Sequence, residues 1–155
     1  MQLFRRSARM QGWLDWYAGD HRDPVNHLIH RICIPLIVFS AVGLLGQAPL
    51  HRTLFGVPLG LPELGLAVLI AFYAQHDLAL ALLAGPFAAV MAVGARYLPW
   101  PVHAGIFAAA WIAQFIGHGA FEKNRPSLAA NVMSLFIAPA FLLDELKYHR
   151  SQGAP

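Results

Sequence analysis

Long stretches without a charged residue dominate this chain, and their lengths predict helices that cross a membrane. A helix needs about 20 apolar residues, with a range of about 17–25, to span the hydrocarbon layer of a bilayer. Residues 32–51, 78–95 and 97–121 form uncharged stretches of that order. Residues 64–76 form a shorter stretch, and residues 128–143 are interrupted by a proline, so these two predict weaker spans that are tilted or re-entrant.

A turn must divide the apolar stretch of residues 64–95, in which Asp77 is the only charged residue. As one helix, with about 1.5 Å of rise per residue, this stretch would be much longer than a membrane is thick. We place the turn at the polar residues 75–77 and consider the Gly85-Pro86 pair the less favourable break. The resulting pattern is about four transmembrane helices, over residues 32–50, 64–75, 78–95 and 102–117, in a single membrane domain of residues 1–155.

The N-terminal segment, residues 3–17, combines large apolar side chains with three arginines. This pattern fits an amphipathic helix that lies in the membrane interface, and it fits equally well a peripheral helix that packs on the bundle. Between the first two predicted spans, prolines and glycines from Pro49 to Pro62 predict a surface loop.

Composition also indicates a membrane protein. Hydrophobic residues make up 57% of the 155 residues and charged residues only 12%, and the mean hydropathy is +0.51. Typical soluble domains have about 45–50% apolar and about 25% charged residues, so polar side chains are too few here to cover a soluble particle. The sequence therefore predicts an all-α fold, an integral membrane helical bundle surrounded by membrane lipids.

Charge and cysteine content exclude several kinds of function. The net charge is +3, but the basic residues are scattered and form no aromatic-and-basic run of the kind that binds nucleic acid. Cys33 is the only cysteine, which excludes a disulfide or a thiolate metal cluster within one chain. A metal ion in this protein would have to be held by histidine and carboxylate side chains.

Basic residues near the ends of spans set the orientation of membrane proteins. If the four predicted spans cross, one side holds seven basic residues, namely Arg5, Arg6, Arg9, Arg22, Arg31, Lys123 and Arg125, and the other holds Arg52 and Arg96. This asymmetry predicts that both termini are cytoplasmic, at a bacterial inner membrane or, in a eukaryote, at the endoplasmic reticulum. The same topology brings His21 and His30 to the membrane face of His118 and Glu122.

A first polar cluster, HRDPVNHLIH, begins at His21. Asp23-Pro24 is typical of a helix N-cap followed by proline at the first helical position, so a turn separates His21 from the helix. Asn26 and His30 are four residues apart and share a face of that helix, over which His21 would fold. The alternative is that these are interfacial histidines beside an N-cap.

A second polar cluster, QFIGHGAFEKNRPSL, contains His118 and Glu122, whose spacing of four residues suits an imidazole–carboxylate pair on a metal ion. The alternative is a helix that ends in a solvated polar turn. The predicted topology favours the metal site, because it brings both clusters to one face. Glu145 follows the last apolar stretch and returns to this face only if that stretch is re-entrant.

Three segments, HRDPVNHLIHRICIPL, WIAQFIGHGAFEKNRPSL and APAFLLDEL, resemble the signatures of a family of membrane dioxygenases that degrade 2-hydroxy fatty acids. The resemblance implies an iron(II)-dependent enzyme that cleaves a 2-hydroxy fatty acid to CO2 and the fatty acid one carbon shorter. The positions that match the family's signatures are His21, Asn26 and His30 in the first segment, His118 and Glu122 in the second, and Glu145 in the third. His27 stands where the fungal type has an aliphatic residue.

The chemistry implied by the resemblance fits the sequence. The reaction removes four electrons from the substrate, the number that O2 accepts, and the chain has no nucleotide-binding motif for a reductant. Our hypothesis is that His21, His30 and His118, with Glu122, hold Fe(II), and that substrate and O2 bind at its open positions. Asn26, Gln114 and Glu145 would support the site, and Arg31 or Arg125 would neutralise the substrate's carboxylate.

Two alternatives belong to other classes of protein. A non-catalytic membrane scaffold or lipid-binding protein would use the same histidines to hold a structural zinc ion. A transporter would use histidine and glutamate as a proton relay, for which ionisable residues in the middle of the spans are expected. Here the ionisable residues cluster near the span ends.

Overall fold

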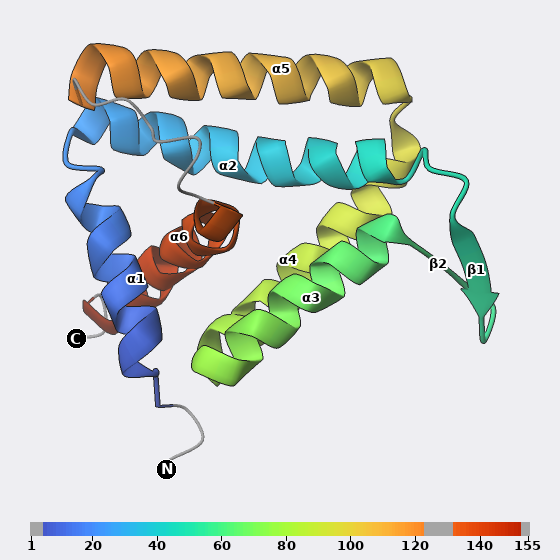
Figure 1. Ribbon diagram of the computed structural model, residues 1–155, viewed down its shortest axis with the longest axis horizontal. Helices are drawn as coiled ribbons and strands as arrows, with labels where there is room; N and C mark the ends of the chain where they lie inside the picture. The colour runs from blue at the N-terminus through green and yellow to red at the C-terminus, as the bar shows by residue number, and fades with distance from the viewer. Residues whose placement is uncertain (1–4, 123–131, 153–155) are drawn as a thin grey trace.

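The computed structural model describes residues 5–122 and 132–152. Within these residues the chain forms six α-helices, which confirms the all-α prediction (Figure 1). Their bounds are Ala8–Gly19 for α1, Pro24–Leu45 for α2, Leu61–His76 for α3, Leu78–Gly94 for α4, Trp100–Gly117 for α5 and Val132–Gln152 for α6. A short 3-10 helix, η1 (Ala95–Tyr97), precedes α5, and a π-helix, η2 (His118–Glu122), extends it.

Helix lengths and hydropathy agree with a membrane bundle. In the described part of the chain, three helical segments are long and apolar enough to cross a membrane, namely Pro24–Leu45, Leu78–Tyr97 and Trp100–Glu122. They contain α2, α4 and α5, which correspond to three of the predicted spans. Helix α3 has only 16 residues and falls short of this length, as its shorter apolar stretch indicated.

Helices α2 and α5 lie side by side and antiparallel, with α5 on one side of α2 and the other helices on its opposite side (Figure 1). Glycine permits this close packing: a Cβ atom at Gly43 would overlap the ring of His103. The His103 imidazole is fully buried, and its Nε2 lies 2.9 Å from the carbonyl oxygen of Ala95. Because α2 and α5 are antiparallel, the start of α2 lies next to the end of α5.

Helices α3 and α4 meet at the turn predicted from the sequence, which the structure confirms. Helix α3 ends at His76, and the Asp77 side chain accepts a hydrogen bond of 3.2 Å from the backbone N–H of Leu80 as the N-cap of α4. Helix α4 then continues through Pro86 without a break. The Asp77 cap explains why the polar turn, and not the Gly85-Pro86 pair, divides the apolar stretch.

Helix α1 packs on the bundle, which favours the second of the two interpretations of the N-terminal segment. Met10 and Leu14 are buried in a core shared with α4 and α6. Arg6 precedes the helix, and its guanidinium binds Asp77 at 2.8 Å and also Asp144 on α6. These contacts tie α1 to the α3–α4 turn and to α6. Residues 128–131, at the start of the C-terminal apolar stretch, lie outside the described residues.

The loop predicted between Pro49 and Pro62 is instead a β-hairpin. Strands β1 (His51–Leu54) and β2 (Val57–Gly60) are antiparallel, with His51 opposite Gly60. Phe55 and Gly56 form the turn with φ angles of 50° and 79°, as in the left-handed turns that suit two-residue hairpins. The strands are only four residues long and β2 contains Pro58, so no alternating pattern was long enough to predict them.

Candidate metal centre

Three histidine side chains converge where α1, α2 and α5 end or begin. His21 lies in the turn between α1 and α2, His30 on α2, and His118 is the first residue of η2. The Nε2 atom of His30 lies 3.1 Å from the Nε2 atoms of both His21 and His118. The potential ligand atoms of all three lie within 4.8 Å of one another, and the rings are buried. The structure therefore brings together the three histidines predicted from two distant segments.

The turn before α2 carries His21 over the face of this helix. The Asp23 side chain accepts hydrogen bonds from the backbone N–H groups of Val25 (2.8 Å) and Asn26 (3.2 Å), and Pro24 occupies the first helical turn. This geometry confirms the N-cap predicted from Asp23-Pro24. Because α2 starts at that point, the chain folds back and His21 reaches His30, nine residues along the sequence.

Backbone carbonyl groups fix the tautomers of two of the rings. The Nδ1 atom of His21 lies 2.7 Å from the Tyr17 oxygen, and the Nδ1 atom of His30 lies 2.9 Å from the Asn26 oxygen. A carbonyl oxygen only accepts hydrogen bonds, so each Nδ1 carries a proton and donates it. Burial lowers the pKa of His21, which keeps its imidazole neutral and its Nε2 lone pair available as a metal ligand.

This donor set fits a divalent transition metal. With Nδ1 protonated, the neutral rings of His21 and His30 direct Nε2 lone pairs at each other across 3.1 Å, and these repel unless a cation lies between them. A proton would serve one pair of nitrogens, whereas a metal ion serves all three. Imidazole is a favoured ligand of iron and zinc, and the Nδ1–carbonyl bonds are the outer contacts expected for metal-binding histidines.

Glu122, which the sequence predicted as a further metal ligand, is not among the converging ligand atoms. Its Oε1 accepts hydrogen bonds from the backbone N–H of Asp23 (2.9 Å) and from Asn26 Nδ2 (3.1 Å). His118 and Glu122 stand at the two ends of a π-helical segment, an irregularity that is frequent at functional sites. The carboxylate therefore faces the start of α2.

Asn26 and Gln114, predicted as supporting residues, are both buried beside the histidines. Asn26 is fully buried, joins Glu122 through its amide, and offers its backbone oxygen to His30. Gln114 lies one turn before His118 on α5, and its backbone oxygen accepts the His118 N–H. Any role of the Gln114 side chain in the reaction stays a prediction.

Glu145 lies on the side of the bundle that carries His27 and Arg31, next to the histidine cluster in the sequence. Its two carboxylate oxygens pair with Arg31 Nε at 3.1 Å and with His27 Nδ1 at 3.4 Å. Glu145 thus joins α6 to the face of α2 that neighbours His30. Arg125, the alternative partner for a substrate carboxylate, lies outside the described residues.

Tyr17 is a contributor that the sequence did not reveal. Its ring stacks on the His21 imidazole with centroids 4.0 Å apart and an angle of 14° between the planes, and its carbonyl group orients the same ring. Burial raises the pKa of the Tyr17 phenol, which keeps it neutral. The available signal was its position four residues before His21, at the end of a helix whose last carbonyl groups lack helical partners.

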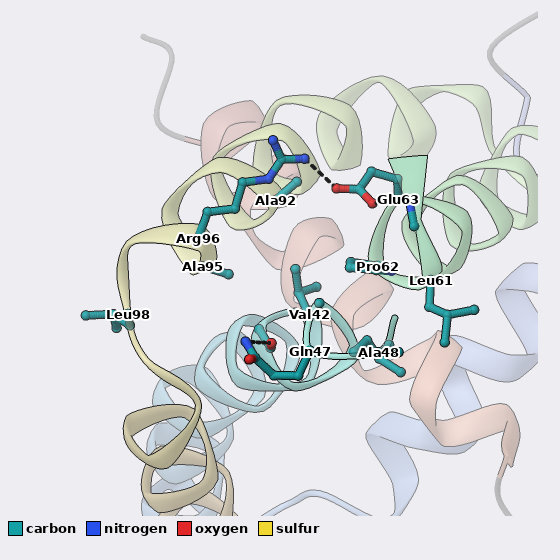
Figure 2. Close-up of a pocket in the computed structure, with 14 residues that line it drawn as sticks. Val42, Gln47, Ala48, Leu61, Pro62, Glu63, Ala92, Ala95, Arg96 and Leu98 are labelled. Carbon is teal, nitrogen blue, oxygen red and sulfur yellow. Dashed lines mark hydrogen bonds and ion pairs between the residues drawn. The ribbon is translucent and has the colours of Figure 1, made fainter. Parts of the chain in front are cut away.

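A separate cavity of about 340 Å³ lies at the other end of α2. Figure 2 shows that Arg96 and Glu63 point toward each other across one side of it, with Nη2 and Oε1 2.6 Å apart. Gln47 and apolar residues at the end of α2, the start of α3 and the end of α4 line most of the rest. None of the converging histidines lines this cavity, so it is distinct from the candidate metal centre.

Comparison with known proteins agrees with the resemblance seen in the sequence. The family model described as 2-hydroxy-palmitic acid dioxygenase Mpo1-like matches residues 7–150. The 2-hydroxy-palmitic acid dioxygenase MPO1 of Saccharomyces cerevisiae is 35% identical over 144 residues, which cover 90% of this chain and 80% of the yeast protein. No solved structure is significantly similar to the chain. This chain belongs to the 2-hydroxy-palmitic acid dioxygenase Mpo1-like family.

Proposed function

We propose that this protein is an iron(II)-dependent dioxygenase that cleaves a 2-hydroxy fatty acid to CO2 and the fatty acid one carbon shorter. The observation that carries the proposal is the convergence of His21, His30 and His118 through their Nε2 atoms. Family membership supports the substrate class, since the yeast relative is named a 2-hydroxy-palmitic acid dioxygenase. The identity of the metal ion and the overall reaction are what we propose.

The reaction balances without a reductant. A 2-hydroxy acid and one O2 give the shorter acid, CO2 and water, and the four electrons lost by the substrate are those that O2 accepts. Iron(II), held by the three imidazoles, would supply the redox chemistry between O2 and the hydroxy acid. A reaction that needs no reductant agrees with a sequence that has a cluster of metal ligands and no motif for binding a reductant.

The chain's own residues would hold the metal and the substrate. Tyr17 and Asn26 keep the His21 and His30 rings in the tautomer that presents Nε2. Arg31, which follows His30 in the sequence, is half exposed and pairs with Glu145, and its positive charge would bind the substrate's carboxylate. Leu28 and Ile32 are exposed on the face of α2 opposite His30, where they would meet the surrounding lipid that supplies the acyl substrate.

The location of the protein is part of the proposal. Three apolar helices support insertion in a membrane, and the charge asymmetry supports cytoplasmic termini on the condition that the shorter α3 crosses as well. The metal centre would then lie at the cytoplasmic end of α2 and α5. A bacterial inner membrane is the setting that we propose, with the endoplasmic reticulum as its equivalent in a eukaryote.

The competing candidate is a scaffold in which the same three histidines hold zinc, a metal that is commonly bound by imidazole. The two candidates are separated by the metal content of protein purified in detergent, followed by anaerobic Fe(II) loading and O2 uptake with 2-hydroxypalmitate. We expect stoichiometric iron and substrate-dependent O2 uptake in the wild type and loss of both in His118→Ala. His103→Ala, which removes another buried α5 imidazole, should keep both. Zinc without O2 uptake would refute the enzyme proposal.

A further inference from the structure

The Glu122 carboxylate occupies the N-terminal end of α2. Its Oε1 accepts the backbone N–H of Asp23, the N-cap residue, and the side-chain N–H of Asn26 in the first helical turn. The N-terminus of a helix carries partial positive charge and unpaired N–H groups, which favour a carboxylate at this position. Glu122 therefore completes the cap that Asp23 begins, although it comes from the distant end of α5.

These contacts join the segments that carry the three histidines. Asp23 lies two residues after His21, while Asn26 supplies the carbonyl group that orients His30. Glu122 itself belongs to the π-helical segment that starts with His118. One carboxylate oxygen thus fixes the relative positions of the turn, the start of α2 and the end of α5.

The packing around Asn26 makes this connection specific. Asn26 is fully buried, and its Oδ1 lies so close to Gly117 that a Cβ atom there would overlap it. The amide can therefore present Nδ2 to Glu122 in one orientation, with Oδ1 turned toward the Gly117 backbone. A side chain held in this way makes a rigid link between α2 and η2.

We propose that Glu122 is a positioning residue, which holds the His21 turn against the end of α5, and is not a ligand of the metal ion. The inference rests on the proposed metal centre and assigns a role within it. The carboxylate oxygen that makes both contacts is already engaged by two N–H donors, and the ligand nitrogens converge without it. An amide oxygen would accept the same two hydrogen bonds, whereas removal of the side chain would break both.

The test compares Glu122→Gln with Glu122→Ala. Metal affinity is measured by competition with a chelator, and coordination by the visible spectrum of the Co(II)-substituted protein. Glu122→Gln should keep an affinity within about threefold of the wild type and an unchanged Co(II) spectrum, because no ligand is lost. Glu122→Ala should weaken binding by about 10–100-fold, the usual cost of losing an outer contact. Loss of metal in Glu122→Gln as complete as in His118→Ala would overturn the inference.

A second variant pair tests the link to Asn26. Asn26→Asp places a second carboxylate against Glu122 Oε1 and should weaken metal binding, and Glu122→Gln in the same chain should partly restore it, because the neutral amide removes the repulsion between the two negative charges. Glu63→Ala is the matched control, since Glu63 also accepts a backbone N–H at a helix start (Gly60, 2.8 Å) but at the far end of the bundle. Failure of the rescue would count against the link.

Hydrogen exchange of the Asp23 amide separates this inference from the proposed function. In metal-free protein, Glu122→Ala should raise the exchange rate of this amide, and Glu122→Gln should leave it unchanged. If the wild type binds no metal but the two variants show this difference in exchange, the proposed function is refuted and the positioning role of Glu122 stands. Equal exchange in all three proteins would refute the positioning role itself.

Discussion

Gly117 allows a direct test of the close contact between α2 and α5 at the candidate metal centre. In Gly117→Ala the new Cβ would overlap Asn26 Oδ1 and lie 3.2 Å from Ile29 Cδ1. Asn26 cannot withdraw easily, because it is fully buried, its Nδ2 donates to Glu122, and its backbone oxygen is held by His30. The helix end that carries His118 would therefore have to move away from α2.

Gly119→Ala provides a matched control for the size of the steric effect of Gly117→Ala. A Cβ at Gly119, in the same π-helical segment, would meet nothing within 4 Å. Both substitutions gain the same order of helix stability from replacing glycine, about 0.5–1 kcal/mol, so their difference isolates the steric cost. Overpacking of a well-packed site costs about 1–3 kcal/mol. Because metal binding requires His30 and His118 together, this cost corresponds to about 5–150-fold weaker binding at 1.4 kcal/mol per tenfold.

The assay is the dissociation constant for Fe(II) or Co(II), measured in detergent by chelator competition for the two alanine variants and the wild type. Gly117→Ala should bind several-fold to a hundredfold more weakly than Gly119→Ala, and its free energy of unfolding without metal should fall below that of the control. Equal affinities of the two variants would refute the conclusion that contact between α2 and the end of α5 sets the metal site.

Three further predictions concern pH and stability. Burial lowers the pKa of His21 below its ordinary value of 6.5. Metal affinity should therefore be constant down to about pH 6.5 and should fall at lower pH, where protons compete with the metal ion for the imidazole. A decline in affinity that starts above about pH 7 would contradict this. Arg6→Ala removes a cation from the buried Asp77 carboxylate and should lower the free energy of unfolding by about 1–3 kcal/mol in denaturant titrations, with an unchanged value as the contrary result. Phe55→Asn should raise the unfolding free energy by about 1 kcal/mol, because Phe55 is 96% exposed and its φ is 50°, which asparagine tolerates better. A destabilised Phe55→Asn variant would show that the exposed ring makes a needed contact.

The arrangement of the helices could be predicted where the sequence carries a length or a cap. The apolar stretches corresponding to α2, α4 and α5 are long, and their lengths alone indicate spans. The α3–α4 turn is marked by Asp77, a polar residue that also caps the next helix. The docking of α1 depends on Arg6 reaching Asp77 and Asp144, which are distant in sequence, so its apolar residues were equally compatible with a helix in the membrane interface.

The three histidines could be predicted because two independent signals agree on them. The Asp23-Pro24 cap turns His21 back over α2, and the topology brings His118 to the same end of the bundle. The placement of Glu122 depends on the π-helix after Gly117, for which the sequence has no signal. Tyr17 was missed because it acts in part through its backbone carbonyl group, which every residue type possesses.

The same carbonyl contacts orient the candidate metal ligands without any contribution from a metal ion. Tyr17 and Asn26 each offer a backbone oxygen to a ring nitrogen, and these oxygens stay in place as long as the helices that carry them are packed. The packing in turn depends on residues remote from the nitrogens, such as Met10 in the core beneath α1. Substitutions in that core should therefore lower metal affinity, because they shift the His21 ring. Equally buried substitutions beside His103, at the opposite end of α2, should change the free energy of unfolding and leave metal affinity unchanged.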